Sequence, residues 1–290
     1  MINLNYRNGG KMSRKKKEVN ILVCGNKKVF DGILTGMISI LNRTNATLNY
    51  YVFTMDVTRL KEEFVPIEDT QIEFLRKILN EKRPGSVIKK IDVTKLYDKE
   101  FKGCPNEKAY CTPYTLIRLL ADLIPDIPNK ILYLDTDIMA NDDILKLYDI
   151  DIKNYEYAAV KEKYGCWLIR PDYINAGVLL MNMKVIKRTR LLKKGRDMLR
   201  KKKMTFADQD AIYWNTTRKK LLPRIYNEQS KVNGKKTVLC HFSKRLKFLP
   251  YPHTTNYKQW DIDKIHNEMH CHAFDKDLEE YQTLKGGYHE

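Results

Sequence analysis

The sequence predicts an α/β protein with a mostly parallel central sheet. Over the first half of the chain, short β-prone apolar runs alternate with segments whose apolar residues recur at helical spacing. Such alternation is typical of a parallel sheet that carries helices on both faces. One apolar run, 131–134, ends in two aspartates, and such sheets bind their ligands where the strands end. The same pattern therefore predicts both a fold class and the position of a candidate site.

The predicted elements follow one another in a regular order. Apolar runs predict strands over 19–24, 48–53, 87–93, 131–134, 157–160, 178–182 and 237–240. Helical spacing predicts helices over 30–41, 72–79, 113–123 and 184–203, with a further amphipathic segment from Asp208. We expect residues 1–18 to be a disordered basic tail, 19–260 to form one domain, and 261–290 to be a polar, partly helical extension.

The composition is strongly basic, with a net charge of +17. Eleven residues between 184 and 203 are Lys or Arg. Such an excess attracts polyanions, including anionic membrane surfaces and phosphorylated substrates, although a solvated charged helix would show the same pattern. The sequence has no zinc-finger spacing and no aromatic-basic ribonucleoprotein motif, so we expect no specific nucleic-acid partner.

Apolar runs in the sequence are short. None approaches the roughly 20 residues that a membrane span needs, and no secretory signal is evident. We therefore expect a cytoplasmic protein, with peripheral contact to the inner face of the membrane through the basic helix as an open alternative. The six cysteines lack metal-finger spacing, and we expect most of them to be reduced thiols in or near the core.

Two carboxylates follow the central apolar run. Side chains at i and i+2 of an extended segment point the same way, so Asp135 and Asp137 face one direction at the strand end. Two like charges brought together are costly unless something positive lies between them. A divalent cation is the simplest candidate. Two solvated loop aspartates, one of them capping the next helix, are the alternative that these residues alone leave open.

Four stretches, in the same order, resemble the motifs of glycosyltransferase family 8, a group of retaining sugar-nucleotide transferases. They are Arg-Leu at 118–119 in the segment 114–119, Tyr-Leu-Asp-Thr-Asp at 133–137, Asn-Ala-Gly at 175–177, and Asp-Gln-Asp at 208–210. A fifth stretch, 240–242 with Lys247, partly resembles the family's closing His-Phe-x-Gly-x-x-Lys-Pro-Trp segment. The likeness covers roughly residues 19–250.

The resemblance implies a GT-A fold, a Rossmann-like nucleotide domain, over residues 19–260. It implies a manganese ion, with magnesium as the alternative, held by Asp135, Asp137 and His241, and two carboxylates with one imidazole suit such an ion. The donor-binding residues that it implies are Cys24, Asn26, Arg118, Thr136, Asn175, Ala176 and Lys247. The catalytic residues that it implies, near the reacting sugar carbon, are Asp208, Gln209 and Asp210.

The implied reaction is the metal-dependent, retaining transfer of a hexose, glucose or galactose, from a UDP-sugar to a glycan, glycolipid or glycoprotein acceptor, as in lipopolysaccharide or cell-surface glycan synthesis. We expect front-side transfer, because Gln209 is a poor nucleophile for a double displacement. Two stretches depart from the family. In the first, Lys27 and Lys28 follow Asn26, where the family often has acidic or amide residues. In the second, the closing segment, Lys244 replaces the family's glycine and no Pro-Trp pair follows Lys247.

Two other functions stay open from the sequence. A metal-dependent nucleotidyltransferase or phosphohydrolase would use the same aspartates, although the stretches 175–177 and 208–210 argue against it. A non-catalytic, polyanion-binding scaffold with a decayed sugar-nucleotide site would fit the basic charge and the altered closing segment. Four residues that could bind a metal also cluster near the C-terminus: His266, His270, Cys271 and His272. A second metal site is one interpretation of this cluster, and a plain polar helix face is the other.

Overall fold

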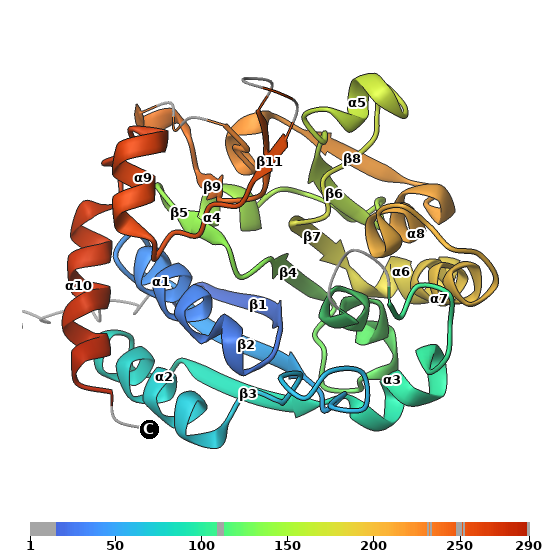
Figure 1. Cartoon of the computed structure of the whole chain (residues 1–290), viewed down its shortest axis with the longest axis horizontal. Coiled ribbons are helices and arrows are strands. Elements are labelled where there is room, and N and C mark those ends of the chain that lie inside the picture. Colours follow the sequence, from blue (N-terminus) through green and yellow to red (C-terminus); the bar gives the residue numbers. More distant parts are fainter. Residues whose placement is uncertain are drawn as a thin grey trace, which may run out of the picture.

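A computed structural model of the chain (Figure 1) describes residues 16–108, 113–230, 232, 234–247, 251 and 253–288. Residues 1–15 of the predicted basic tail lie outside the described residues. That tail was expected to run to residue 18, but Glu18 already belongs to the first strand, β1 (Glu18–Cys24).

A seven-stranded sheet forms the centre of the molecule, with the strand order β3-β2-β1-β4-β7-β6-β8. The further strands are β2 (Thr47–Thr54), β3 (Val87–Asp92), β4 (Lys130–Leu134), β6 (Tyr157–Val160), β7 (Val178–Asn182) and β8 (Lys219–Leu222). Strands β1 to β4 run parallel, whereas β7 runs antiparallel to both of its neighbours. The prediction of a mostly parallel α/β sheet is confirmed, and the reversal at β7 is its exception.

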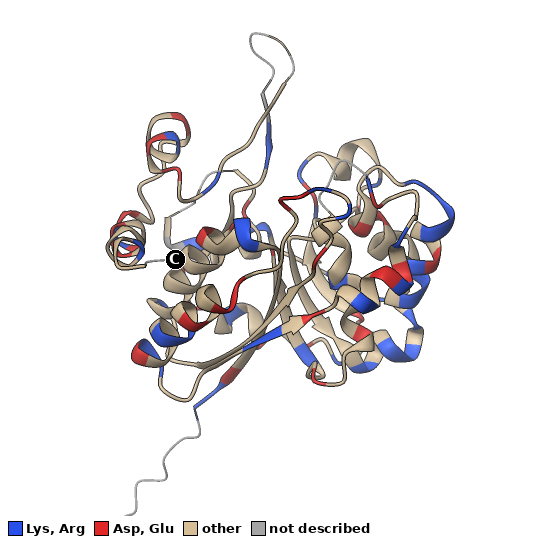
Figure 2. Cartoon of the chain, turned by 60° about the horizontal axis from the view of Figure 1, so that its bottom comes forward, with Lys and Arg blue, Asp and Glu red and all other residues tan. Residues whose placement is uncertain are grey.

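Alternate residues of the central strands face two separate apolar cores. In β1, Val19, Ile21 and Val23 pack into one core, and Leu22 and Cys24 pack into the other, as the two-residue period of a strand requires. The first core is covered by α1 (Phe30–Leu41), α2 (Asp69–Lys82) and α10 (Asp275–Gly286). The second is covered by α3 (Thr94–Phe101), η2 (Pro113–Leu123), α6 (Met183–Thr189), α7 (Leu191–Lys201) and α8 (Ala207–Asn215). Figure 2 shows helices on both sides of the sheet.

Two small sheets flank the central one. β5 (Ile138–Ala140) pairs with β9 (Leu239–His241), and β10 (Arg245–Lys247) pairs with β11 (His253–Thr255), both antiparallel. The short helices are η1 (Lys27–Val29), α4 (Leu145–Tyr148), α5 (Gly165–Leu168), η3 (Arg224–Tyr226) and η4 (Gly234–Lys236). Among the described residues, no helix has both the length and the apolar character that crossing a bilayer requires.

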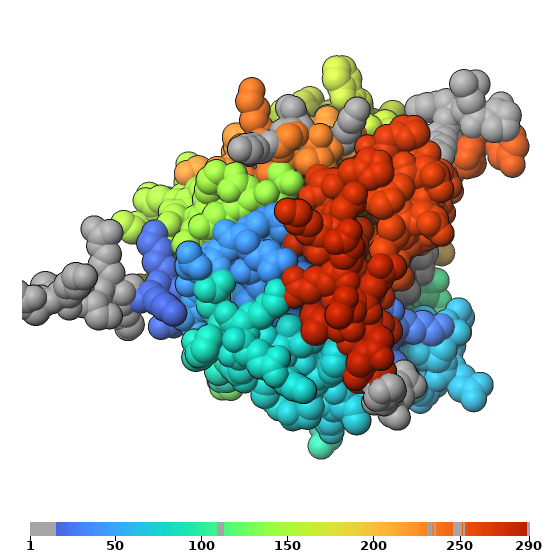
Figure 3. All heavy atoms as spheres, turned by 90° about the vertical axis from the view of Figure 1, so that its left-hand side faces the viewer, coloured from blue at the N-terminus to red at the C-terminus, as the bar shows by residue number. Residues whose placement is uncertain are grey.

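The C-terminal segment packs against the amino-terminal half of the chain. α9 (Ile262–Met269) precedes α10. Figure 3 shows α10 (red) beside α1 (blue), whereas Ile265 of α9 packs into a cluster with Met139, Cys240 and Phe242. The hydroxyl of Tyr281 donates to Asp31 at 3.0 Å, and Arg43 pairs with Asp277 at 2.7 Å. Because Tyr281 also belongs to the first core, α10 contributes to the packing of that core as well as covering it.

The prediction of one continuous basic helix over 184–203 is wrong. The chain breaks at Arg190, whose φ of 60° and ψ of 31° end α6 and begin α7. The break allows apolar residues of both helices to reach the same core. One of the predicted surface cations is internal, because Arg196 is only 2% exposed and pairs with Glu100 and Asp122. The cations that stay exposed here are Lys184, Lys187, Arg188, Arg190, Lys194, Arg200, Lys201, Lys202 and Lys203.

Candidate active site

A pocket at the carboxyl ends of β1 and β4 gathers most of the predicted donor-binding residues. Its volume is about 340 Å³. Parallel strands end at a common edge, which is why segments far apart in the sequence meet there. The lining includes Cys24, Asn26, Arg118, Asp135, Thr136 and Asp137.

His241 reaches the two aspartates through a pair of short strands. β9 runs against β5, and the backbone N–H of Phe242 donates to the carbonyl oxygen of Asp137 at 2.8 Å. This pairing places Nε2 of His241 3.1 Å from Oδ1 of Asp137 and 3.8 Å from Oδ2 of Asp135. The three side chains offer ligand atoms that all lie within 4.8 Å of one another. Two carboxylates and one imidazole suit manganese, so these residues fit the implied ion.

A chain of side-chain amides fixes the orientation of His241. The backbone N–H of Gly177 donates to Oδ1 of Asn175 at 2.9 Å, and Nδ2 of Asn227 donates to the same oxygen at 2.8 Å. The other end of that amide, Oδ1 of Asn227, lies 3.2 Å from Nδ1 of His241 and therefore accepts its proton. With Nδ1 bound to Asn227, Nε2 is the ring nitrogen that faces Asp137 and that can ligate a metal once it is deprotonated. Asn227 is fully buried, and nothing in the sequence marks it as a site residue.

Arg118 lies buried behind the aspartates. Its guanidinium donates to Oδ1 of Asp135 at 2.8 Å and pairs with Oδ2 of Asp208 at 3.2 Å. It also donates to the carbonyl oxygen of Ala176 at 2.7 Å and stands 4.0 Å from the ring centroid of Tyr133. Because Arg118 and the hydroxyl of Tyr133 both bind Oδ1 of Asp135, the second oxygen of that carboxylate is the one available to the candidate metal site.

The reversed strand β7 brings the Asn-Ala-Gly turn to the same edge as the aspartates. The backbone N–H of Asp135 donates to the carbonyl oxygen of Gly177 at 2.8 Å. A Cβ atom on Gly177 would lie 2.3 Å from Cε1 of His241 and 2.9 Å from Oδ2 of Asp135, so only glycine fits there. The backbone N–H of Ala176 donates to Oε1 of Gln209 at 2.9 Å. The Asn-Ala-Gly turn therefore contacts both the 133–137 stretch and the 208–210 stretch beside the candidate metal site.

The first turn of α8 carries the Asp-Gln-Asp stretch, whose members face different surroundings. Asp208 and Gln209 contact the cluster described above. The two oxygens of Asp210 are instead held by the hydroxyl of Tyr173 at 2.6 Å and by the backbone N–H of Phe206 at 2.9 Å. The structure thus brings two of the three predicted catalytic residues to the site and engages the third with Tyr173 and Phe206.

Lys258 is a site residue that the sequence analysis missed. Its Nζ lies 3.0 Å from Oδ2 of Asp137, and it lines the pocket. Lys247, which the resemblance had suggested, belongs to β10 of the β10–β11 hairpin. A signal for Lys258 was present, because Trp260 follows it two residues later, as in the Lys-Pro-Trp ending of the family segment. An insertion within 243–257 separates this ending from its histidine.

Charge and burial together determine the protonation of these groups. Burial alone would raise the pKa of Asp137, but His241 and Lys258 outweigh it and lower that pKa. Burial opposes the charged form of His241 as well, and the neighbouring aspartates outweigh it and raise its pKa. Burial raises the pKa of Asp208 and that of the Cys24 thiol, so the thiol stays protonated at neutral pH.

The two lysines that depart from the family pattern are paired with acids from a later loop. Nζ of Lys28 lies 3.1 Å from Glu63, and Nζ of Lys27 lies 2.9 Å from Glu68. Asn26 caps η1 by accepting a hydrogen bond from the backbone N–H of Lys28 at 3.2 Å. Both Lys28 and Glu63 line the pocket, so an acidic side chain stands there although the loop 26–28 carries none.

Comparisons with known proteins agree with this geometry. The family model described as glycosyl transferase family 8 matches residues 20–263. A putative glycosyltransferase of Haemophilus influenzae is 23% identical, over 67% of this chain and 58% of that protein. A lipopolysaccharide 1,3-galactosyltransferase of Salmonella typhimurium is 27% identical, over 46% of this chain and 44% of that protein. The matches thus span less than two thirds of the length of these relatives.

Solved structures extend the likeness to the whole fold. The galactosyltransferase LgtC, in complex with donor and acceptor sugar analogues, has a TM-score of 0.66 at 17% identity, over 94% of this chain and 97% of that one. The glycosyltransferase GlyE of Streptococcus pneumoniae has a TM-score of 0.61 at 17% identity, over 93% of this chain and 63% of that one. At such identities the likeness concerns the fold alone, and it confirms the expected GT-A architecture.

Proposed function

This chain is a glycosyltransferase of family 8, and we propose that it is a metal-dependent, retaining enzyme that transfers glucose or galactose from a UDP-sugar to a glycan, glycolipid or glycoprotein acceptor. The observation that carries the proposal is the convergence of Asp135, Asp137 and His241, whose ligand atoms lie within 4.8 Å of one another beside the pocket. A nucleoside diphosphate would be repelled by the two carboxylates unless a cation joined them to it.

We assign Asp135, Asp137 and His241 as the protein ligands of a divalent ion. Manganese is our first choice and magnesium our second, because the set includes an imidazole. When bound, the ion supplies Lewis-acid stabilisation of the charge that develops on the leaving UDP. Asn227 holds His241 in the tautomer that ligation needs, and the guanidinium of Arg118 holds the far oxygen of Asp135.

The pocket is assigned to the nucleotide. Lys258 pairs with a carboxylate oxygen here, and we assign it to the diphosphate, whose oxygens carry the same kind of charge. Cys24, Asn26 and Thr136 would contact the nucleoside from the ends of β1 and β4. Glu63 is suited to accept hydrogen bonds from ribose hydroxyls, because it lines the same pocket.

The donor sugar is assigned to the space beside the Asn-Ala-Gly turn. Gln209 binds the backbone of Ala176 through its side-chain oxygen, which also directs partial negative charge toward a sugar that becomes positive during transfer. We infer front-side transfer, in which the leaving phosphate accepts the proton of the acceptor hydroxyl. Asp210 acts as a positioning residue, since both of its oxygens are engaged by Tyr173 and Phe206.

The acceptor is assigned only by class. The Salmonella relative is a lipopolysaccharide 1,3-galactosyltransferase, which supports a surface glycan as the acceptor and galactose as the sugar. We propose a cytoplasmic enzyme that contacts the inner face of the membrane through the exposed cations of α6 and α7.

Calorimetric titration of UDP into the full chain tests the site. We expect binding in manganese and little binding in EDTA. Asp137→Asn should weaken the manganese-dependent binding at least about tenfold, because one ligand loses its charge. Asp126→Asn is the matched control, since Asp126 is exposed and pairs only with Lys89 at the surface. Binding of UDP that neither EDTA nor Asp137→Asn changes would overturn the metal site.

Product analysis separates the proposed function from its competitors. The parent should release intact UDP from UDP-glucose or UDP-galactose when a glycan acceptor is present. Release of UMP or pyrophosphate would identify a phosphohydrolase or a nucleotidyltransferase. A chain that binds polyanions but neither UDP nor manganese would be the scaffold with a decayed site.

A further inference from the structure

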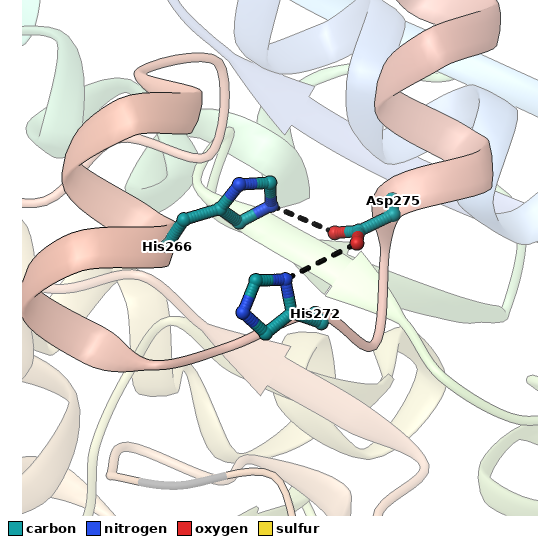
Figure 4. Close-up of side chains that lie close together, drawn as sticks. All are labelled: His266, His272 and Asp275. Atoms are coloured by element: carbon teal, nitrogen blue, oxygen red, sulfur yellow. Dashed lines mark hydrogen bonds and ion pairs between the residues drawn. The ribbon is translucent and has the colours of Figure 1, made fainter.

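Two imidazoles and a carboxylate meet at the junction of α9 and α10, and none of the three lines the nucleotide pocket (Figure 4). Nε2 of His266, on α9, lies 2.8 Å from Oδ1 of Asp275, the first residue of α10. Nδ1 of His272, in the connection between the helices, lies 3.2 Å from Oδ2 of the same carboxylate. The two imidazole rings lie against each other at a tilt of 34°, with centroids 4.3 Å apart.

The backbone holds this arrangement in place. His270 ends α9 in the left-handed conformation, with φ 48° and ψ 44°, and its N–H donates to the carbonyl oxygen of His266 at 3.1 Å. That turn directs His272 back over His266. Cys271 and Phe274, on either side of His272, are buried in one apolar cluster with Ile265. The connection is therefore anchored on both sides of the exposed histidine, and its donor atoms are held close together before any ligand binds.

We propose that His266, His272 and Asp275 form a second metal site, which binds zinc with water as the fourth ligand. The ligand atoms all lie within 4.8 Å of one another. Bonds of about 2.0–2.1 Å to a tetrahedral zinc ion separate its ligands by about 3.3 Å. Each imidazole lies near that distance from one oxygen of the carboxylate, His266 from Oδ1 at 2.8 Å and His272 from Oδ2 at 3.2 Å. Two imidazoles and one carboxylate form a softer set than the two carboxylates and one imidazole at the nucleotide pocket. The set here therefore favours zinc over manganese more strongly than the set at the nucleotide pocket does, so excess manganese competes with zinc mainly at the nucleotide pocket.

The bound ion would link the end of α9 to the start of α10. The segment that precedes α9 carries Lys258 and Gln259, and the side-chain amide of Gln259 donates to the carbonyl oxygen of Thr136 at 2.9 Å, next to the metal-binding aspartates. α10 in turn is bound to α1 through Tyr281 and Asp31. Zinc at the junction therefore stabilises the wall of the nucleotide pocket without contacting any reactant.

Zinc stoichiometry measured on the full chain tests this inference. The protein is stripped with a chelator, equilibrated with zinc in the presence of excess manganese, and analysed for bound zinc per chain. His272→Ala is the informative variant, because this side chain is 63% exposed and its loss should not affect folding. His270→Asn is the control, since His270 lies between the two ligands in the chain and asparagine tolerates its left-handed backbone. Asp137→Asn reports on the nucleotide site.

We expect one zinc per chain in the parent, in His270→Asn and in Asp137→Asn. His272→Ala should bind zinc at least about tenfold more weakly. Removing a residue that supports a metal ligand weakens metal binding about tenfold to a hundredfold, and removing the ligand itself should weaken it at least as much. Zinc should also raise the melting temperature of the parent by at least about 2 °C and that of His272→Ala by less. Equal zinc affinity in the parent and His272→Ala, or zinc lost only in Asp137→Asn, would refute the proposal. A parent that retains no zinc would reduce the cluster to an ion-paired helix cap.

Discussion

The side-chain oxygen of Asn227 lies 3.2 Å from Nδ1 of His241, on the side of the imidazole away from Asp137. We expect Asn227→Ala to weaken manganese-dependent UDP binding by about tenfold to a hundredfold, because the imidazole loses the partner that fixes its tautomer. Asn141→Ala is the matched control, since Asn141 anchors the nearby chain at residues 234 and 237 without touching the metal ligands. Calorimetry on both variants checks the prediction, and equal losses in both would attribute the effect to general destabilisation.

The position of Lys258 predicts which lysine of the closing segment binds the diphosphate. Lys258→Ala should weaken UDP binding in manganese by about tenfold to a hundredfold, which is the worth of one charge-assisted hydrogen bond. Lys247→Ala removes the same charge within the same segment and should leave UDP affinity close to that of the parent. Titration of both variants decides between them, and a loss confined to Lys247→Ala would reassign the contact.

The packing around Gly177 predicts a large effect from a single methyl group. Gly177→Ala should abolish manganese-dependent UDP binding, because the added Cβ would lie 2.3 Å from the imidazole of His241. Gly286→Ala adds the same group at the end of α10, where nothing lies within 4 Å, and should leave binding unchanged. Metal and UDP titrations compare the two variants. A Gly177→Ala protein that bound both ligands normally would show that the site tolerates displacement of this strand.

The carboxylate of Glu156 should make a pH-dependent contribution to the stability of the fold, independent of the active site. Burial opposes its charge, but hydrogen bonds from Thr189, Thr216 and the backbone N–H groups of Arg218 and Thr217 outweigh burial and lower its pKa. A carboxyl whose folded pKa is depressed stabilises the protein above its unfolded pKa of about 4.3, and this stability is lost as the pH falls through the folded pKa.

Glu156→Gln should therefore lower the free energy of unfolding by about 1–3 kcal/mol at pH 7. The difference from the parent should shrink as the pH falls below about 4. Urea unfolding at a series of pH values measures both. A difference that stays constant down to pH 3 would show that the hydrogen bonds do not depend on the charge of this carboxyl.

The exposed cations of α6 and α7 predict a salt-dependent attraction to anionic membranes. Sedimentation with vesicles that contain anionic lipid should decrease steeply between low and physiological salt, because surface charges are screened over about 8–10 Å. Replacing Lys184, Lys187 and Arg188, which are exposed on α6, with glutamine should reduce the bound fraction. Binding that is absent, or insensitive to salt, would exclude the membrane contact and leave the transfer chemistry untouched.

The sheet and the two candidate metal-binding aspartates could be predicted from the sequence because local patterns encode them. The apolar run before Asp135 has the length and residue types of a buried strand, and the spacing of Asp135 and Asp137 follows directly from strand geometry. His241 required more than local pattern. β9 has only three residues, and its partner β5 lies about a hundred positions earlier in the chain, so the resemblance to a family supplied what periodicity could not.

Residues that act through long-range contacts were beyond the sequence analysis. Asn227 is one polar residue in a loop, and only the fold shows that it lies behind His241. Glu63 pairs with Lys28 across two separate loops. The break at Arg190 arises because two neighbouring apolar stretches must face the same core. The spacing of apolar residues along one continuous helix does not reveal such a break. Lys258 was obscured by an insertion that shifted it away from its expected spacing.

The reversal of β7 has a consequence for how such an enzyme can diverge. Had β7 run parallel to β4, its five residues would have carried the Asn-Ala-Gly turn to the opposite edge of the sheet, about 17 Å away. Because β7 is reversed, the loop that leads into it arrives beside the metal ligands. That loop includes α5, where Trp167 and Leu168 are 87% and 81% exposed. Descendants of this chain can therefore lengthen or rewrite the α5 part of that loop, over 165–168, while the Asn-Ala-Gly turn at its end stays in place.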